Sequence, residues 1–402
     1  MRFTAFLLVF FASFSLLADQ QEWPLWRGPQ KDSISQESTW NPQALKNNKI
    51  LWQKDIGQGY SSVAISENRL YTMGNKKRKD IVFCLNASTG EEIWQYSYEC
   101  TPGSYPGPRS TPVVEGNYVY TFSREGHLFC FFAKDGKVKW SRDLKEAYDF
   151  ASPTWGFSSS VYIWGEMILL NLGKHGIAID KSNGKTLWKS DPTSTCGYAT
   201  PVVYTKDGKD YALMFGQKEL YLVEPKDGKK LWSYPWETKY GVNAADPIVS
   251  HGKIFISSGY DYGCALFQIQ GTKPELIWKK ETMKNHFGTC VLIDGYLYGF
   301  DGQSHKPKDC SLNCISLKTG EIKWKEGLGF GSVMAANNKL IALNAEGKLC
   351  IVEASPDGYK EISSCMLKKA RSSVFWTMPV LCNAKIYCRG SEGELICVDV
   401  KK

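Results

Sequence analysis

Short apolar runs alternate with polar, glycine-containing turns along almost the whole chain. Residues 111–132, TPVVEGNYVYTFSREGHLFCFF, contain three such runs separated by Glu-Gly-Asn and Arg-Glu-Gly turns. Runs of this length, rich in Val, Tyr and Phe and bounded by turn residues, are typical of β-strands. A Lys-Asp-Gly turn and a segment ending at Trp140 follow, and this segment supplies a fourth strand. The pattern predicts four-stranded antiparallel units.

The turn followed by a tryptophan recurs with a period of about 38–48 residues, which is the range of propeller blades. Four antiparallel strands in each period favour a β-propeller over a helical repeat. The repeated segment ends at Trp94, Trp140, Trp188, Trp232 and Trp324, a looser copy ends at Trp278, and a seventh has Ile362 in place of Trp.

The two ends of the repeat region predict how the ring closes. Residues 50–57, ILWQKDIG, form a last strand with no earlier strands before it, and residues 393–400, GELICVDV, form a third strand with no last strand after it. Joining them completes a blade and removes the open edge that a solenoid would expose. We expect an all-β, eight-bladed propeller over residues 50–402, preceded by a non-repeat extension over residues 19–49.

The repeats resemble the pyrroloquinoline-quinone (PQQ) repeat, A-x-D-x-x-T-G-x-x-x-W. This resemblance covers nearly all of residues 50–400 and implies the eight-bladed propeller, an architecture shared by quinoprotein dehydrogenases and BamB-like assembly proteins. The opening WPLWRGP (residues 23–29) is similar to the start of exported bacterial PQQ-binding-like or polyvinyl-alcohol-dehydrogenase-like propellers. The matching residues are Ala178, Asp180, Gly184 and Trp188 in one repeat, Thr319, Gly320 and Trp324 in another, and Thr89, Gly90 and Trp94 in a third.

The motif has a physical logic, because the turn glycine tolerates positive φ and the Trp buries a large flat surface between adjacent blades. A small residue at the Ala position lets the ring pack closely, and Cys behaves there as a small buried hydrophobe. We therefore expect most of the 13 cysteines to be packing thiols. Two alternatives remain open: a metal pair at Cys310 and Cys314, and a bridge between Cys382 and Cys388. Cysteine takes the Ala position at Cys84, Cys130, Cys314 and Cys397.

The first 18 residues are typical of a bacterial export signal. Arg2 is followed by an apolar stretch from Phe3 to Leu17 and by the small residue Ala18. The apolar stretch is short for a membrane span, and no second one approaches that length. We expect a periplasmic or secreted protein without a transmembrane segment after signal removal, and a monomer.

The formal charge of +8 comes from scattered Lys and Arg residues. The one basic run, Lys76 to Lys79, sits at an expected hairpin tip. A nucleic-acid site would need a basic stripe interleaved with aromatic residues, so no nucleic-acid partner is expected.

Candidate binding residues come from the segments that lead into the first strand of each blade, because these strands line the channel. Small residues and proline repeat there, while the residues beside them vary in chemistry. Such side chains converging on the axis predict a ligand funnel. The candidates are Tyr60, Arg109, Trp155, Tyr198, Asn243, Asp246, His286 and Trp376.

Each candidate also has a structural interpretation. Asp246 precedes a proline and a strand, which suits a turn cap. Arg109 can tie a loop through carbonyl oxygens, His286 can be a packed side chain, and Trp155 and Trp376 can fill the channel. No G-x-S-x-G, H-E-x-x-H or Walker-type motif is present, so neither a catalytic residue nor a metal ligand is assigned.

Two functions remain. We favour a binding or scaffold module that takes a protein or a cell-surface polymer at its funnel, as the BamB-like resemblance implies. The alternative is a PQQ-dependent alcohol dehydrogenase, in which quinone stacks on a Trp beside a Ca²⁺ ion held by Glu, Asn and Asp oxygens. Asn243 and Asp246 near Trp155 could be a vestige of that site, but the adjacent Cys-Cys pair of such enzymes is missing.

Overall fold

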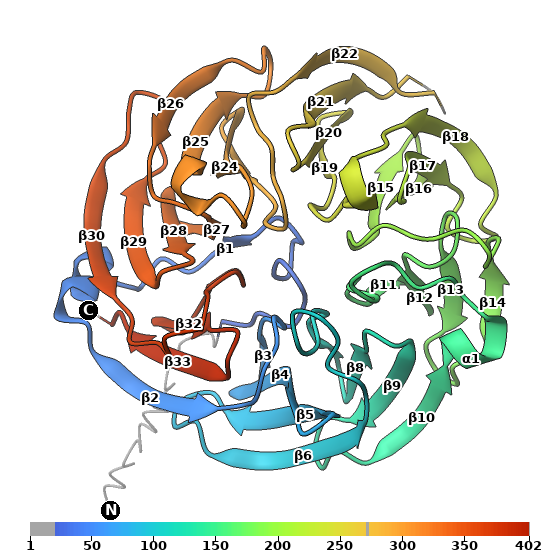
Figure 1. The fold of residues 1–402 in the computed structure, drawn as a ribbon, viewed down its shortest axis with the longest axis horizontal. Helices are drawn as coiled ribbons and strands as arrows, with labels where there is room; N and C mark the ends of the chain where they lie inside the picture. Colours follow the sequence, from blue (N-terminus) through green and yellow to red (C-terminus); the bar gives the residue numbers. More distant parts are fainter. Residues whose placement is uncertain (1–20, 271–272, 402) are drawn as a thin grey trace, which may run out of the picture.

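Eight sheets surround a central axis in the computed structural model, which describes residues 21–270 and 273–401 (Figure 1). Each sheet has four antiparallel strands, and one has an additional parallel strand at its inner edge. The prediction of an all-β, eight-bladed propeller is therefore confirmed. The expected signal segment, residues 1–18, lies outside the described residues.

Seven blades are built from consecutive strands, with the first strand of each nearest the axis (Figure 1). Blade 1 contains β3 (Ala64–Ser66), β4 (Arg69–Lys76), β5 (Lys79–Asn86) and β6 (Glu92–Glu99). Blade 2 contains β7 (Val113–Glu115), β8 (Tyr118–Phe122), β9 (His127–Phe132) and β10 (Val138–Asp143), and blade 3 contains β11 (Tyr162–Trp164), β12 (Met167–Leu170), β13 (Ile177–Asp180) and β14 (Thr186–Lys189). Blade 4 contains β15 (Val202–Lys206), β16 (Lys209–Phe215), β17 (Glu219–Val223) and β18 (Lys230–Pro235).

The second half of the ring repeats this order. Blade 5 contains β19 (Ile248–Ser250), β20 (Lys253–Ser258), β21 (Gly263–Gln268) and β22 (Glu275–Lys280), and blade 6 contains β23 (Val291–Ile293), β24 (Tyr296–Asp301), β25 (Ser311–Ser316) and β26 (Ile322–Glu326). Blade 7 contains β27 (Gly331–Ala336), β28 (Lys339–Asn344), β29 (Lys348–Glu353), β30 (Glu361–Met366) and the added β1 (Ile34–Ser35). The helices are short: α1 (Leu144–Tyr148) and the 3₁₀ helices η1 (Pro42–Asn47), η2 (Lys239–Gly241) and η3 (Pro307–Asp309).

Blade 8 joins the two ends of the repeat region, as predicted. It contains β31 (Val380–Cys382), β32 (Lys385–Arg389), β33 (Glu394–Asp399) and, as its outer strand, β2 (Ile50–Asp55). Antiparallel pairing of β2 with β33 places Trp52 opposite Cys397. This pairing gives blade 8 the same small-residue and Trp arrangement that the continuous blades have.

At five interfaces within the described residues, the repeated Trp of one blade rests on a turn glycine of the next. A Cβ atom added to Gly90, Gly136 or Gly228 would lie 2.4–2.7 Å from the indole of the preceding blade, so the ring rests directly on the glycine backbone. The indole N–H also donates to a carbonyl oxygen of that same turn, for example from Trp188 to Pro225 at 2.9 Å. The Trp and Gly of the motif are therefore two halves of one contact between blades.

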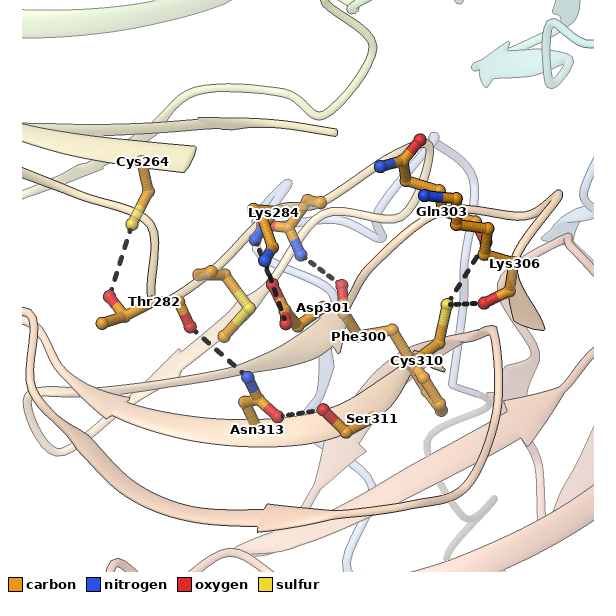
Figure 2. A network of polar contacts seen from close by, with 12 residues as sticks. Cys264, Thr282, Lys284, Phe300, Asp301, Gln303, Lys306, Cys310, Ser311 and Asn313 are labelled. Atoms are coloured by element: carbon orange, nitrogen blue, oxygen red, sulfur yellow. Dashed lines mark hydrogen bonds and ion pairs between the residues drawn. The ribbon is translucent and has the colours of Figure 1, made fainter. Parts of the chain in front are cut away.

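The Cys positions behave as expected. Cys84 lies opposite Trp94 in its blade, and Cys314 lies opposite Trp324. All 13 cysteines are free thiols in this structure and all except the half-buried Cys365 are buried. Cys382 and Cys388 form no bridge, and the Cys310 thiol donates to the carbonyl oxygens of Gln303 and Lys306, both at 3.3 Å (Figure 2).

Ile362 replaces Trp in blade 7 because the next blade has no covalent turn for an indole to rest on. The chain segment before β2 fills this position instead. Helix η1 packs against β30, its Leu45 is fully buried, and the Ser363 hydroxyl donates to the Pro42 carbonyl oxygen.

Residues 21–41, here called the N-terminal strap, cross one end of the channel (Figure 1, blue). This is the end that carries the hairpins between first and second strands. Trp23 pairs with Ile65 of blade 1, and the Pro24 carbonyl accepts from the Val114 amide of blade 2. The strap then runs on to blade 7, where β1 pairs with β27. The expected extension is thus an integral part of the propeller.

The basic run lies where the sequence predicts it. The run from Lys76 to Lys79 forms the tip of the β4–β5 hairpin, and its two ends pair with Asp55 and Glu99. Within residues 21–270 and 273–401, no helix is long and apolar enough to cross a membrane.

We predict that a side chain added at a glycine that contacts the Trp lowers the free energy of unfolding by more than the backbone cost of the substitution alone. Gly228→Ala places a Cβ atom 2.4 Å from the Trp188 ring at φ +74°, whereas Gly208→Ala in the same blade has φ +72° and no neighbour within 4 Å. Both variants incur a left-handed backbone cost of about 1–2 kcal/mol. Only Gly228→Ala adds an overpacking cost of about 1–3 kcal/mol. Denaturant unfolding should rank it clearly below Gly208→Ala, and equal stabilities would contradict the role of the contact.

Candidate functional site

A cavity of about 210 Å³ lies on the propeller axis. Its floor is formed by the strap residues Trp26, Arg27 and Ser33. Small residues of the first-strand loops form the walls. The mouth is lined by aromatic side chains from the loops that enter the blades and from the turns between second and third strands. The lining residues at the mouth are Tyr60, Tyr105, Arg109, Trp155, Tyr198, Tyr260, Phe287, His305 and Trp376.

Seven of the eight predicted residues line this cavity. Their blades lie all around the axis, so the convergence follows from the propeller geometry. Whether they bind a ligand remains a prediction. The seven are Tyr60, Arg109, Trp155, Tyr198, Asp246, His286 and Trp376.

The aromatic rings form a nearly continuous arc around the mouth. Trp376 stacks on Tyr60 at 5.4 Å and contacts Phe287 at 5.3 Å, measured between ring centroids. On the other side, Trp155 lies 6.1 Å from Tyr198. Such rings present large, rigid apolar faces with little rotamer freedom to lose on binding. The arc runs through Tyr198, Trp155, Tyr240, Tyr260, His286, Phe287, Trp376 and Tyr60.

Arg109 occupies the gap in this arc. Its guanidinium lies 5.8 Å from the centre of the Tyr60 ring and donates to the carbonyl oxygens of Ser104 and Tyr105. Burial, together with the nearby Arg124, lowers the pKa of Arg109 to about 10, so the group stays cationic at neutral pH. The loop-tying and the cavity-lining interpretations of Arg109 therefore both hold.

A belt of hydrogen bonds connects the first-strand loops below the mouth. In each case a backbone N–H donates to a side-chain oxygen of the following blade, over 2.8–3.1 Å. Asp246 is the one carboxylate in a belt otherwise made by hydroxyl groups. The residues run in the order Ser62, Thr111, Ser160, Thr200, Asp246 and Thr289.

The second oxygen of Asp246 holds the floor in place. It accepts a hydrogen bond from the Trp26 indole at 2.7 Å and lies 4.0 Å from an Arg27 nitrogen. Burial raises the pKa of Asp246, while Arg27 and the two hydrogen bonds oppose this shift. One oxygen of Asp246 thus binds the belt and the other binds the strap. Asp246 therefore does not cap a turn, and neither of its oxygens is free to act as a base.

Asn243 is the predicted residue that does not line the cavity. It is fully buried, and its amide donates to the carbonyl oxygens of Gly216, Gln217 and Trp236. Its side-chain oxygen accepts a hydrogen bond from Ser258. Asn243 fixes the loop before blade 5 and takes no part in the cavity surface.

His286 offers an unused donor to the cavity. Its Nδ1 accepts from the Ser304 N–H at 3.2 Å, so a neutral ring carries its proton on Nε2. Burial, with a smaller effect of His305, lowers the pKa of His286 to about 3 and keeps the ring neutral. Within the described residues, neither His286 Nε2 nor the Ser332 Oγ has a hydrogen-bond partner. Both residues are buried and line the cavity.

Two groups of residues that line the cavity were not predicted from the sequence. The turns between second and third strands contribute Tyr260 and His305, and the strap contributes Trp26 and Arg27. The first pair could have been found by aligning these turns as well as the loops into each blade. The second pair lies in the conspicuous WPLWRGP segment, but nothing in that sequence indicates that it reaches the axis.

The family model described as outer membrane protein assembly factor BamB matches residues 78–326, more than half of the chain. This chain belongs to the BamB family. The protein of that name from Yersinia pestis is 22% identical over 302 residues, which cover 70% of this chain and 72% of the relative. The Burkholderia pseudomallei protein of the same name is 22% identical over 270 residues, 62% of this chain and 65% of the relative.

Solved structures of both a BamB and a quinoprotein superpose on this chain. BamB from Moraxella catarrhalis superposes with a TM-score of 0.61 at 15% identity, covering 87% of this chain and 98% of the other. Quinohemoprotein alcohol dehydrogenase from Comamonas testosteroni gives 0.72 at 12% identity, covering 95% of this chain and 81% of the other. At such identities the likeness concerns the fold alone.

The site does not fit a calcium-bound quinone. Calcium takes about six to eight oxygen ligands. Asp246 is the single carboxylate among the residues that line the cavity; it is already bound by Trp26 and Thr200, and a guanidinium nitrogen of Arg27 lies 4.0 Å away. Asn243, the other proposed ligand, is turned into the protein. The idea that Asn243 and Asp246 are a vestigial calcium site therefore disagrees with the geometry.

We predict that His286 makes stability depend on pH. Because its folded pKa is about 3 and its ordinary value is 6.5, the unfolded chain binds a proton between these pH values that the folded chain does not. The free energy of unfolding should therefore fall on acidification through this window, at up to about 1.4 kcal/mol per pH unit from this group. His286→Gln should show a shallower fall in denaturant unfolding between about pH 6 and pH 4. The exposed His251→Gln control should follow the wild type, and identical slopes in all three proteins would contradict a neutral His286.

Proposed function

We propose that this BamB-family chain is an exported binding module that holds a polypeptide segment at the mouth of its axial cavity. The observation that carries the proposal is the arc of aromatic rings above two buried, unpartnered polar groups, His286 and Ser332. An apolar surface with a few convergent polar groups is what ligand sites generally present. Export rests on the sequence of residues 1–18 and is part of the proposal.

The hydrogen-bonding chemistry suits a polypeptide. Arg27, Arg109 and the His286 Nε2–H offer donors, while the single lining carboxylate, Asp246, has both oxygens engaged. A peptide offers these donors a carbonyl acceptor at every residue. Aromatic or apolar side chains of the same segment would lie against the rings of the arc. The names of the curated relatives, which refer to assembly of outer membrane proteins, agree with a polypeptide ligand.

Binding of a test peptide checks this function. We expect a fluorescein-labelled peptide that alternates Phe or Tyr with Thr to bind the purified chain, and a Gly/Ser/Thr peptide of equal length to bind far more weakly. Trp155→Ala and Trp376→Ala should each weaken binding by about tenfold or more, as central aromatic residues commonly do. Fluorescence anisotropy gives the affinities, and Leu187→Ala on the outer strand β14 is the matched control.

Four results would contradict the proposal. The aromatic peptide could fail to bind, or it could bind without any effect of the Trp155 and Trp376 substitutions. Binding of chitohexaose in its place would favour a cell-surface polymer. A rise in melting temperature with PQQ and Ca²⁺ together would favour the dehydrogenase alternative, since a ligand stabilises the state that binds it.

A further inference from the structure

A second cluster of reactive side chains lies between blades 1 and 2, outside the axial cavity. Cys100, Glu125 and His127 place one possible ligand atom each within 4.8 Å of one another. Cys100 follows β6, Glu125 lies in the β8–β9 turn, and His127 begins β9. These elements come together because the two blades are neighbours in the ring, so the cluster is set by the fold rather than by a flexible surface.

Buried polar atoms without partners surround this cluster. Asp80 is fully buried; one of its oxygens accepts from Asn75 at 2.7 Å, and the other has no partner within the described residues. The Tyr98 hydroxyl and the Arg124 Nε are likewise buried without a partner. Among these groups only the Asp80 oxygen can bind a cation; in its absence the Cys100 thiol is a neighbouring donor to this carboxylate.

The charge around the cluster favours a cation. Asp80, Glu125 and Asp143 supply three carboxyl groups, against the two guanidinium groups of Arg124 and Arg109. Arg124 donates to the carbonyl oxygens of Thr101 and Trp155.

The environment of His127 matches that of a metal ligand. Its Nε2 lies 3.4 Å from an Asp143 carboxylate oxygen, which leaves Nδ1 for a metal. Histidine ligands commonly donate their other ring N–H to a carboxylate in this manner. The Ser123 hydroxyl, which lies 3.0 Å from Nδ1, would lose this hydrogen bond when a metal binds there. Glu125 could use one oxygen for the metal and still accept a hydrogen bond from Thr101 with the other.

We propose that Cys100, Glu125 and His127 supply three ligands to a zinc ion, which leaves its fourth position to water. Thiolate, imidazole and carboxylate together suit zinc rather than calcium or magnesium. Binding breaks the S–H bond of Cys100 and forms a Zn–S bond, so one proton is released to solvent for each ion. The ion would anchor the start of the 100–112 loop, which carries Tyr105 and Arg109 to the cavity mouth.

Cobalt is a direct probe, because a thiolate ligand gives Co²⁺ a near-ultraviolet charge-transfer band. We expect the chelator-treated full chain to bind one Co²⁺ with this band, and one Zn²⁺ to abolish it. Cys100→Ser should remove the band, and His127→Gln should weaken zinc binding about 10–100-fold. The half-buried Cys365→Ser control should behave like the wild type.

The proposal is overturned if Co²⁺ gives no thiolate band, or if the band persists in Cys100→Ser. Calorimetry in two buffers of different ionisation enthalpy provides a second test on the unmodified chain. Release of about one proton per zinc supports loss of the thiol proton on binding. No proton release contradicts the proposal. Asp143→Asn, which keeps all three ligands, should weaken zinc binding while leaving the charge-transfer band in place, and unchanged affinity would count against the arrangement.

Discussion

The contact between a Trp of one blade and the turn glycine of the next determines most of this structure. The indole needs a flat backbone surface and a carbonyl acceptor, and the Gly-containing turn provides both, as Trp188 shows with Gly228 and Pro225. Because most blades rest on the next one in this way, an open series would leave a terminal Trp without its partner turn, and closure into a ring supplies it. The composite blade formed by β2 and β33 makes that closure, and Trp52 of β2 rests on Gly90 of blade 1.

Ring closure creates an axial channel, and the N-terminal strap turns this channel into a cavity with a floor. The belt of hydroxyl groups around the axis contains one carboxylate, Asp246, whose spare oxygen holds Trp26 of the strap. Asp246, which the sequence offers as a candidate binding residue, is thus a structural link between the belt and the strap. The same link holds an Arg27 guanidinium nitrogen 4.0 Å from the Asp246 carboxylate, a surrounding that does not suit a calcium ligand.

The fold could be predicted from the sequence because its main signals are local and periodic. Each Gly turn and Trp are close in sequence, and their spacing gives the blade number and the position of closure. The candidate site could be predicted in part, since residues such as Tyr60, Trp155 and Trp376 occupy equivalent positions before their first strands. The direction of a side chain is not periodic: Asn243 stands at an equivalent position but turns inward to bind three carbonyl groups. The floor depends on a long-range contact between residues 26 and 246, which no local pattern encodes.

Site-specific photo-cross-linking tests the central claim, peptide binding at the axial mouth, most directly. Benzoylphenylalanine would replace Tyr105 at the mouth in one variant and Leu187 on an outer strand in another, two positions with similar exposures of 51% and 47%. We predict that the aromatic peptide cross-links at position 105, that unlabelled peptide competes, and that position 187 gives no product. Equal cross-linking at both positions, or cross-linking at position 187 alone, would contradict binding at the mouth.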